Sequence, residues 1–342
     1  MSGEDLELFT FTGGLTLEAA DQMRENVIGI IRIPVGLVKG LAINNRCVDV
    51  PIATEEHGVV AQASTGARLA ALGGGFTAEY TGNIMRGQLQ VINVPDMEAA
   101  MGRVLAEKEA LLLDANTVST TRKAIGMGMR TLQSEVGPMM VVELFVDVRD
   151  SMGANLVDSM CELIAPTVEK LTGGHVNMRI LSNLATERMV RVKAAVPASQ
   201  LGEGVAMRIT EACSFAEADP YRAVTHNKGI MNGVVGVLLA TGNDTRAVEA
   251  GAHAYAAFSG QYKSLSTWRV KGDMLVGALE MPLSVGTVGG VVQAHRLARL
   301  VLKLLGAETA SELAMIAGAT GLACNLGALH ALVTGGIRCT QS

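Results

Sequence analysis

Lys228 and Asp244 are two residues whose types and spacing suit acid–base chemistry. They lie sixteen positions apart within the tract 219–255, each among small and polar residues, with an apolar segment between them. We expect both to stand in loops, from which the lysine could point its ammonium at a bound carbonyl while the aspartate holds it protonated or relays a proton. On this tract alone, a partly solvated structural ion pair is the more common interpretation, because such pairs also perturb pKa values.

Two domains are expected to position these residues, because 342 residues exceed one ordinary core. Between 84 and 185, strand and helix patterns interleave. The predicted strands are 84–94, 139–148 and 175–183, and the predicted helices are 97–115 and 153–171. This order is typical of a compact α+β unit of the ferredoxin-like, split βαβ type, with its helices on one face of a sheet. We therefore predict that residues 84–185 are inserted between two parts of a larger domain, 1–83 and 186–342.

The larger domain reads as mainly helical, above all after residue 200. Residues 55–72 read as a helix rich in alanine that is entered through a loop with two glutamates, and residues 293–307 have the spacing of an amphipathic helix. Thr309 and Glu312 form a capping box in front of a long segment of small apolar residues. That segment has so few polar residues that it predicts a helix buried on most of its surface.

Composition and charge exclude several kinds of partner. The net charge is −5 with both signs interspersed, so no basic face is available for a nucleic acid. No run approaches the roughly 18 uninterrupted apolar residues that span a bilayer, and the acidic start MSGEDLELFTF does not resemble a signal peptide. The five cysteines are scattered without a C-x-x-C pair, which predicts reduced thiols and no metal site. A cytoplasmic protein without a membrane or nucleic acid partner is expected.

Several motifs, in order along the chain, resemble those of the soluble class II 3-hydroxy-3-methylglutaryl-CoA (HMG-CoA) reductases, and the resemblance covers nearly the whole chain. Besides the tract 219–255, they are RENVIGIIRIPVG (24–36), IATEEHGVVAQAS (52–64), VDVRDSMGANLVDSM (146–160) and ALEMPLSVGTVGG (278–290). The resemblance implies a large substrate-binding domain with an inserted cofactor domain. It also implies a homodimer or a higher assembly of dimers, with residues 24–36 at the subunit interface.

The resemblance assigns roles to five residues of the large domain. Glu56, Lys228 and Asp244 become the catalytic residues, with Lys228 stabilising the oxyanion of the thioester carbonyl and Asp244 tying Lys228 to Glu56 in a hydrogen-bonded network. Arg222 would hold the terminal carboxylate of the acyl group, as a fork-shaped donor suits. Asn232 would lie near the reacting oxygen.

A dinucleotide site is implied by the third motif. Its residues are Asp150, Met152, Gly153, Ala154 and Asn155. The physical chemistry agrees, because a glycine turn that leads into a helix offers backbone N–H groups to a pyrophosphate. Either NADPH or NADH could serve. Arg122 and Lys123 stand nearby without an acid that would bind a ribose 2′-hydroxyl, which favours NADPH.

The implied reaction interconverts HMG-CoA with mevalonate and CoA through two hydride transfers from NAD(P)H. Each transfer leaves negative charge on one oxygen, so a cation backed by a proton source lowers the barrier. The direction of the physiological reaction stays open.

The end of the chain departs from the family pattern. The family carries a histidine that protonates the departing CoA thiolate, followed by a mobile flap, whereas this chain reads IRCTQS and places Gln341 near that position. Glutamine cannot donate a proton as an imidazolium does, and His330 lies a full helix earlier. We therefore expect low activity of this 342-residue form. The alternative is a flapless, impaired reductase-like dimer that binds HMG-CoA or cofactor in a regulatory or binding role.

Overall fold

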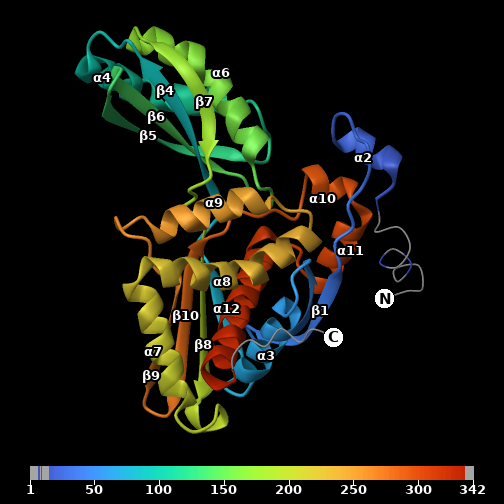
Figure 1. Ribbon diagram of the computed structural model, residues 1–342. Helices are drawn as coiled ribbons and strands as arrows, with labels where there is room; N and C mark the ends of the chain where they lie inside the picture. Colours follow the sequence, from blue (N-terminus) through green and yellow to red (C-terminus); the bar gives the residue numbers. More distant parts are fainter. Residues whose placement is uncertain (1–6, 8, 10–14, 336–342) are drawn as a thin grey trace. The chain divides into compact units, whose positions relative to one another are not determined.

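The computed structural model describes residues 7, 9 and 15–335, and the chain divides into two compact units (Figure 1). The larger unit contains the chain up to Thr81 and from Met189 onward, and the smaller unit contains Gly82–Arg188. Both units combine helices with a sheet, so the fold is of the α+β class. The predicted insertion, 84–185, falls within the smaller unit.

The smaller unit is a four-stranded antiparallel sheet covered by helices. Its elements are β4 (Ile84–Ile92), α4 (Met97–Ala106), α5 (Lys108–Ala115), β5 (Lys123–Ser134), β6 (Gly137–Asp147), α6 (Ala154–Thr172) and β7 (His175–Ser182). The strands pair in the order β5-β6-β4-β7. Alternate residues of β4, such as Met85 and Leu89, point into a core shared with α6, because side chains alternate across a strand.

Two features of the smaller unit differ from the sequence expectation. The predicted helix 97–115 is broken at Glu107, whose backbone leaves helical geometry, so that α4 and α5 are separate helices. Strand β5 was not predicted, because Gly126 and Gly128 weaken the strand pattern. In the sheet, the ring of Phe145 on β6 lies beside both glycines and covers their bare backbone.

The larger unit holds a six-stranded sheet as well as its helices. The strands are β1 (Val35–Ile43), β2 (Arg46–Ala53), β3 (Phe76–Tyr80), β8 (Met189–Pro197), β9 (Ser266–Lys271) and β10 (Met274–Pro282), in the order β2-β1-β3-β8-β10-β9. The helices are α2 (Leu17–Met23), α3 (Val59–Ala71), α7 (Val205–Ala218), α8 (Pro220–Ala240), α9 (Thr245–Ala256), α10 (Gly290–Ala294), α11 (Arg296–Leu305) and α12 (Ala310–Thr334). The description of this domain as mainly helical after residue 200 therefore missed the β9–β10 hairpin, which is short and lies between helices.

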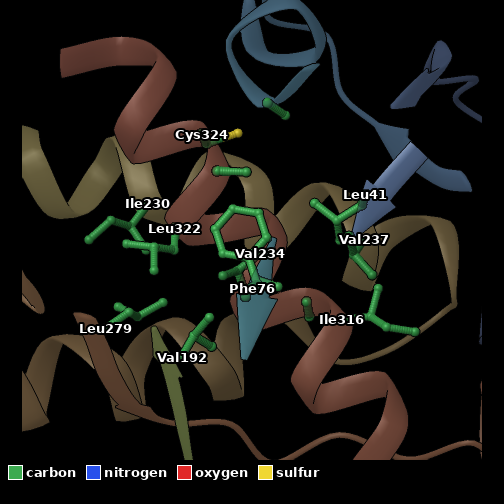
Figure 2. Close-up of a cluster of buried hydrophobic side chains, with 14 of the residues drawn as sticks. Leu41, Phe76, Val192, Ile230, Val234, Val237, Leu279, Ile316, Leu322 and Cys324 are labelled. Atoms are coloured by element: carbon green, nitrogen blue, oxygen red, sulfur yellow. The ribbon is translucent and has the colours of Figure 1, made fainter. Parts of the chain in front are cut away.

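Helix α12 forms the centre of the larger unit. Figure 2 shows its Ile316, Leu322 and Cys324 among side chains of α8 and the sheet, with Phe76 in the middle. Among the described residues, α12 alone is long and apolar enough to cross a membrane, with mean hydropathy 1.5, yet 72% of that apolar window is buried inside the protein. A core helix explains this composition, as the sequence predicted.

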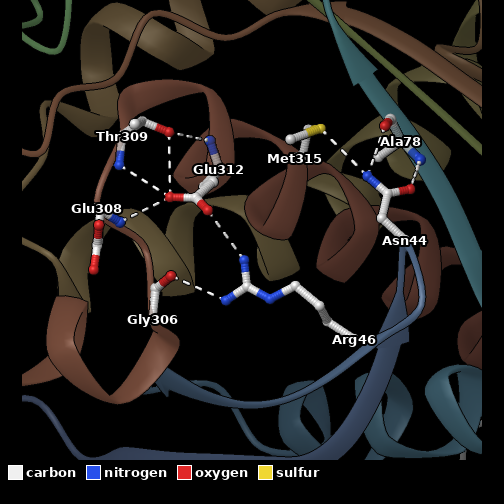
Figure 3. A network of polar contacts seen from close by, with 8 residues as sticks. All are labelled: Asn44, Arg46, Ala78, Gly306, Glu308, Thr309, Glu312 and Met315. Carbon is white, nitrogen blue, oxygen red and sulfur yellow. Dashed lines mark hydrogen bonds and ion pairs between the residues drawn. The ribbon is translucent and has the colours of Figure 1, made fainter.

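The start of α12 is fixed by the predicted capping box and by one arginine. The Thr309 hydroxyl accepts from the Glu312 N–H while the Glu312 carboxylate accepts from the Thr309 N–H, so the capping box is confirmed. Arg46 from β2 donates to Glu312 Oε1 at 3.1 Å and to the Gly306 carbonyl at 3.0 Å, and both contacts are drawn in Figure 3. These bonds tie the β1–β2 hairpin to the junction of α11 and α12. The predicted helix 293–307 is interrupted at His295, which separates α10 from α11.

Candidate active site

Lys228 lies in the middle of α8, so the expectation that it stands in a loop is wrong. The helix begins at Asp219, whose carboxylate accepts from the Arg222 N–H at 2.8 Å, and Pro220 occupies its first turn. An aspartate before a proline is a helix start signal, but the glycine at position 229 weakened the helical pattern of the tract. Asp244 does stand at a helix boundary, as the N-cap of α9, where its carboxylate accepts from the Ala247 N–H at 3.1 Å.

Glu56 and Lys228 form a direct ion pair. Glu56 comes after β2 in a short loop that ends at Gly58, whose φ of 86° begins α3. The Glu56 N–H donates to Thr54 Oγ1 at 3.1 Å, which closes the loop locally. The exposed fractions are 55% for the lysine side chain and 46% for the glutamate side chain. A pair this open adds little to folding stability, but a ligand can reach it.

The predicted link through Asp244 is not formed. Among the described residues, its carboxylate contacts only its own helix, at the Ala247 N–H and, 3.9 Å away, at Arg246 Nε. The contact between Lys228 and Glu56 is made without it. The turn before Asp244 is anchored separately, since Asn243 Oδ1 accepts from the Gly286 N–H at 2.8 Å. Asp244 as a proton relay stays a prediction.

The two predicted substrate-binding residues also lie on α8. Asn232 comes four residues after Lys228, which places both on one face of the helix. Arg222 is in the first turn, six residues before Lys228, and is partly exposed. A single helix therefore carries a guanidinium, an ammonium and an amide. Their contacts with substrate stay predictions.

The predicted dinucleotide motif forms the turn from β6 into α6. Gly153 has a φ of 96°, and an added Cβ there would lie 2.5 Å from Val148 Cγ1, so both backbone and space require glycine. Because Gly153 has no side chain to cap α6, the first N–H groups of the helix remain available to an anion. Ala154 and Met152 are half-buried and Asn155 is exposed beside these N–H groups, whereas Asp150 precedes the turn.

Arg188 supports this turn and was not singled out from the sequence. Its side chain is fully buried, and its Nη1 lies 3.1 Å from the Met152 carbonyl and 3.3 Å from the Ser151 carbonyl. A buried arginine must be hydrogen-bonded, but its partners lie 36 and 37 residues earlier in the sequence. No local pattern could have predicted this contact.

Arg122 and Lys123 lie at the same end of the sheet as the α6 turn. Lys123 is the register partner of Asp147, the last residue of β6, and the chain passes from there into the turn that ends at Gly153. Ser119 organises the loop, since its hydroxyl accepts from the Arg122 N–H and its carbonyl accepts from Lys123 Nζ, both at 3.1 Å. Two cations therefore lie in the neighbourhood of the predicted pyrophosphate site.

Three of the four cysteines that the structure describes are buried thiols, and Cys47 is exposed. Burial raises the pKa of Cys161 and of Cys324 to about 12 and that of Cys213 to about 11, so all three remain protonated thiols. In the part of the chain that the structure describes, no group of three His, Cys, Asp or Glu side chains could hold a metal ion. The position near Gln341, where the family histidine was expected, lies outside the described residues and stays a prediction.

Comparison with known proteins decides the family. The family model of hydroxymethylglutaryl-coenzyme A reductase matches residues 1–340. The chain belongs to this family. An HMG-CoA reductase of Archaeoglobus fulgidus is 47% identical over 333 residues, which cover 95% of this chain and 76% of the relative. A probable HMG-CoA reductase of Borreliella burgdorferi is 34% identical over 92% of this chain and 74% of its own length.

Solved structures agree with the sequence relatives. A class II HMG-CoA reductase of Streptococcus pneumoniae, bound to NADPH in open conformations, superimposes with a TM-score of 0.94 at 37% identity, over 98% of this chain and 94% of that one. A second structure of the Streptococcus pneumoniae reductase gives a TM-score of 0.95 at 36% identity, over 99% of this chain and 83% of that one. The α+β class and the HMG-CoA reductase activity of the mevalonate pathway, dependent on NAD(P)H, are therefore established for this chain.

Proposed function

We propose that the Lys228–Glu56 pair is the centre at which HMG-CoA is reduced to mevalonate. The observation that carries the proposal is a lysine and a glutamate in direct contact, both about half exposed, from elements 172 residues apart in sequence. Lys228 Nζ donates a hydrogen bond to the thioester oxygen as negative charge develops there. Glu56 keeps the ammonium in place and serves as a proton store for that oxygen.

The remaining steps use the same two side chains. Each of the two reductions would take its hydride from a separate NAD(P)H molecule, so the oxidised cofactor would have to be exchanged for a second NAD(P)H between them. After the first, the oxygen of the hemithioacetal is held by Lys228, and collapse of that species expels CoA as a thiolate, which must take up a proton. The second reduction converts mevaldehyde to mevalonate, and the alkoxide receives its proton through Lys228 and Glu56. Arg222 anchors the distal carboxylate, Asn232 lies near the reacting oxygen, and Asp244 contributes to the proton relay.

We propose NADPH as the preferred cofactor and the smaller unit, a split βαβ fold, as its binding domain. The N–H groups at the start of α6 would receive the pyrophosphate, with Asp150, Met152, Gly153 and Asn155 around it. The loop with Arg122 and Lys123, at the same end of the sheet, would meet a 2′-phosphate. The related Streptococcus pneumoniae reductase bound to NADPH supports this assignment.

We also propose a homodimer, or an assembly of dimers, in the cytoplasm. The support comes from residues 24–36, in which Ile28 is 102% and Ile31 is 91% exposed. Apolar side chains presented in this way are typical of surfaces that a partner subunit covers.

Replacement of Lys228 tests the catalytic proposal. We expect Lys228→Ala to lower kcat for HMG-CoA reduction by about 10²- to 10³-fold, because an oxyanion donor is lost. Its thermal unfolding should be unchanged, since the ion pair is half-exposed. The matched control is Lys303→Ala, an exposed lysine in the last turn of α11, which should keep full activity. A Lys228→Ala protein that retains kcat within twofold would rule out the proposed role.

A further inference from the structure

A buried polar cluster lies behind the helix that carries Lys228. His226 Nε2 is 2.7 Å from Ser266 Oγ and 3.1 Å from Asn325 Nδ2. Asn325 Oδ1, on α12, lies 2.9 Å from the same serine hydroxyl and accepts from Trp268 Nε1 at 2.8 Å. All four side chains are at most 2% exposed. Burial, followed by the nearby charge of Arg222, lowers the pKa of His226 to about 4, so the imidazole is neutral near pH 7.

Asn227 adds a second anchor directly before Lys228. Its amide donates to the Lys263 carbonyl at 2.8 Å and accepts from the Leu265 N–H at 2.9 Å. The side chain is fully buried, so these bonds form out of reach of water. Consecutive residues of α8 are thus bonded to α12 and to the segment 263–266 that leads into β9.

Helix geometry turns these anchors into a constraint on Lys228. Residues two apart in an α-helix point about 200° apart around its axis, so His226 and Lys228 face opposite sides of α8. The face of α8 that carries His226 is hydrogen-bonded within the core. The face that carries Lys228 is exposed, and there Lys228 pairs with Glu56. A rotation of α8 by about 20° would carry an atom roughly 8 Å from the axis through about 3 Å, which is enough to break the contact with Glu56.

Apolar packing alone does not fix this rotation. Glycines bring α8 and α12 close, since an added Cβ at Gly233 would lie 2.6 Å from the Thr320 carbonyl oxygen. This close approach sets the separation of the helices, but dispersion contacts are not directional. Hydrogen bonds are directional, and a buried polar network contributes more to a unique geometry than to stability.

We propose that His226 and Asn325 are positioning residues for Lys228, holding α8 at the rotation in which the ammonium meets Glu56. The inference rests on the proposed function of Lys228. Neither side chain is placed at the substrate; both act through the helix. Loss of the anchor leaves the active-site residues present but frees α8 to sample rotations in which the ammonium misses the reacting oxygen.

Two substitutions of His226 test the proposal. His226→Leu removes the hydrogen bonds while filling the space, and we expect kcat to fall about 10- to 100-fold with little change in KM for NAD(P)H, because a displacement of ångström size costs that much in rate. His226→Gln can place its amide oxygen near the position of Nε2, where it accepts from Asn325 Nδ2, and should restore kcat to within about threefold of the parent. If His226 had only a structural role, His226→Leu would lower the thermal stability and the amount of folded protein, and His226→Gln would not restore kcat. That result would overturn the proposal.

A double-mutant cycle separates this inference from the proposed function. If His226 acts through Lys228, adding His226→Leu to Lys228→Ala lowers the residual kcat no further. Equal and additive losses in both backgrounds would contradict the positioning role while leaving the role of Lys228 intact. Full activity of Lys228→Ala alone would instead contradict the proposed function. A crystal structure of His226→Leu gives the independent measurement: the Lys228–Glu56 contact should be broken or weakly occupied, and an unchanged contact would overturn the proposal.

Discussion

At the scale of single residues, the site depends on which carboxylate pairs with the Lys228 ammonium. Lys228 was predicted from its tract, yet its partner Glu56 comes from a loop 172 residues earlier. Asp244, the partner that the tract suggested, is the N-cap of α9. Aspartate is a preferred N-cap whether or not it has a catalytic role. The residue type therefore predicted a carboxylate near a helix start but could not distinguish a cap from a proton relay.

Two substitutions at Asp244 separate the cap from the relay. Asparagine is as good an N-cap as aspartate, so Asp244→Asn should keep the parent stability, whereas Asp244→Ala should lose about 1 kcal/mol of unfolding free energy. If the carboxylate takes part in proton transfer, Asp244→Asn also lowers kcat by about 10²-fold or more. Urea denaturation and steady-state kinetics provide the two measurements. Parent kcat in Asp244→Asn would leave Asp244 as a cap only.

At the scale of elements, close crossings of α12 with its neighbours build the larger unit. Gly66 on α3 and Gly327 on α12 allow backbone contact, because a Cβ at Gly66 would lie 1.9 Å from the Ala323 carbonyl oxygen and one at Gly327 would lie 2.0 Å from the Gln62 carbonyl oxygen. Helix α3 starts three residues after Glu56 and packs in the core, so this crossing also fixes the loop that presents the glutamate. The composition of α12 predicted that it is buried. Which backbone segment packs against each glycine, however, could be learned only from the tertiary structure.

A glycine comparison tests the α3–α12 crossing. We expect Gly66→Ala to lower the free energy of unfolding by about 1–3 kcal/mol or more, because the added methyl meets backbone that cannot move aside. The control is Gly102→Ala, within α4, where nothing lies within 4 Å of the new Cβ. That variant should gain about 0.5–1 kcal/mol through helix propensity. Equal effects of the two substitutions in chemical denaturation would show that the crossing tolerates the extra methyl.

At the scale of the whole molecule, two separate hydrophobic cores divide the chain. The smaller unit also carries its own charge cluster, in which Glu143 lies 3.3 Å from Arg86 Nη1 and 3.2 Å from Arg130 Nε. Burial raises the pKa of the Glu143 carboxyl, but the hydrogen bond from Gln88, the charges of Arg86 and Arg130 and the hydrogen bond from Arg130 outweigh it, so the net shift is downward. We therefore expect a substitution or a protonation within the smaller unit to change the stability of that unit more than the stability of the larger one.

Acid should remove the contribution of Glu143. Because its folded pKa lies below its unfolded value of about 4.3, the carboxylate stabilises the smaller unit above that value, and this contribution is lost as the pH falls through the folded pKa. Glu143→Gln should destabilise the smaller unit at pH 7 and flatten its acid dependence below about pH 4.5. Scanning calorimetry between pH 7 and pH 3.5 provides the measurement. An unchanged acid dependence in Glu143→Gln would contradict the assignment.

The sequence by itself determined the family, the α+β class, the capping box of α12 and the tract that contains Lys228. These features depend on local patterns, since helix periodicity, helix caps and sequence motifs are each formed by residues that are close together in the sequence. Only the tertiary structure decided that Lys228 stands within a helix, that Glu56 is its direct partner, that Arg188 holds the Gly153 turn and that His226 and Asn325 meet behind α8. The three contacts join residues far apart in the sequence, so no local pattern specifies them. For Arg188, His226 and Asn325, burial also forces the polar groups to find hydrogen-bond partners.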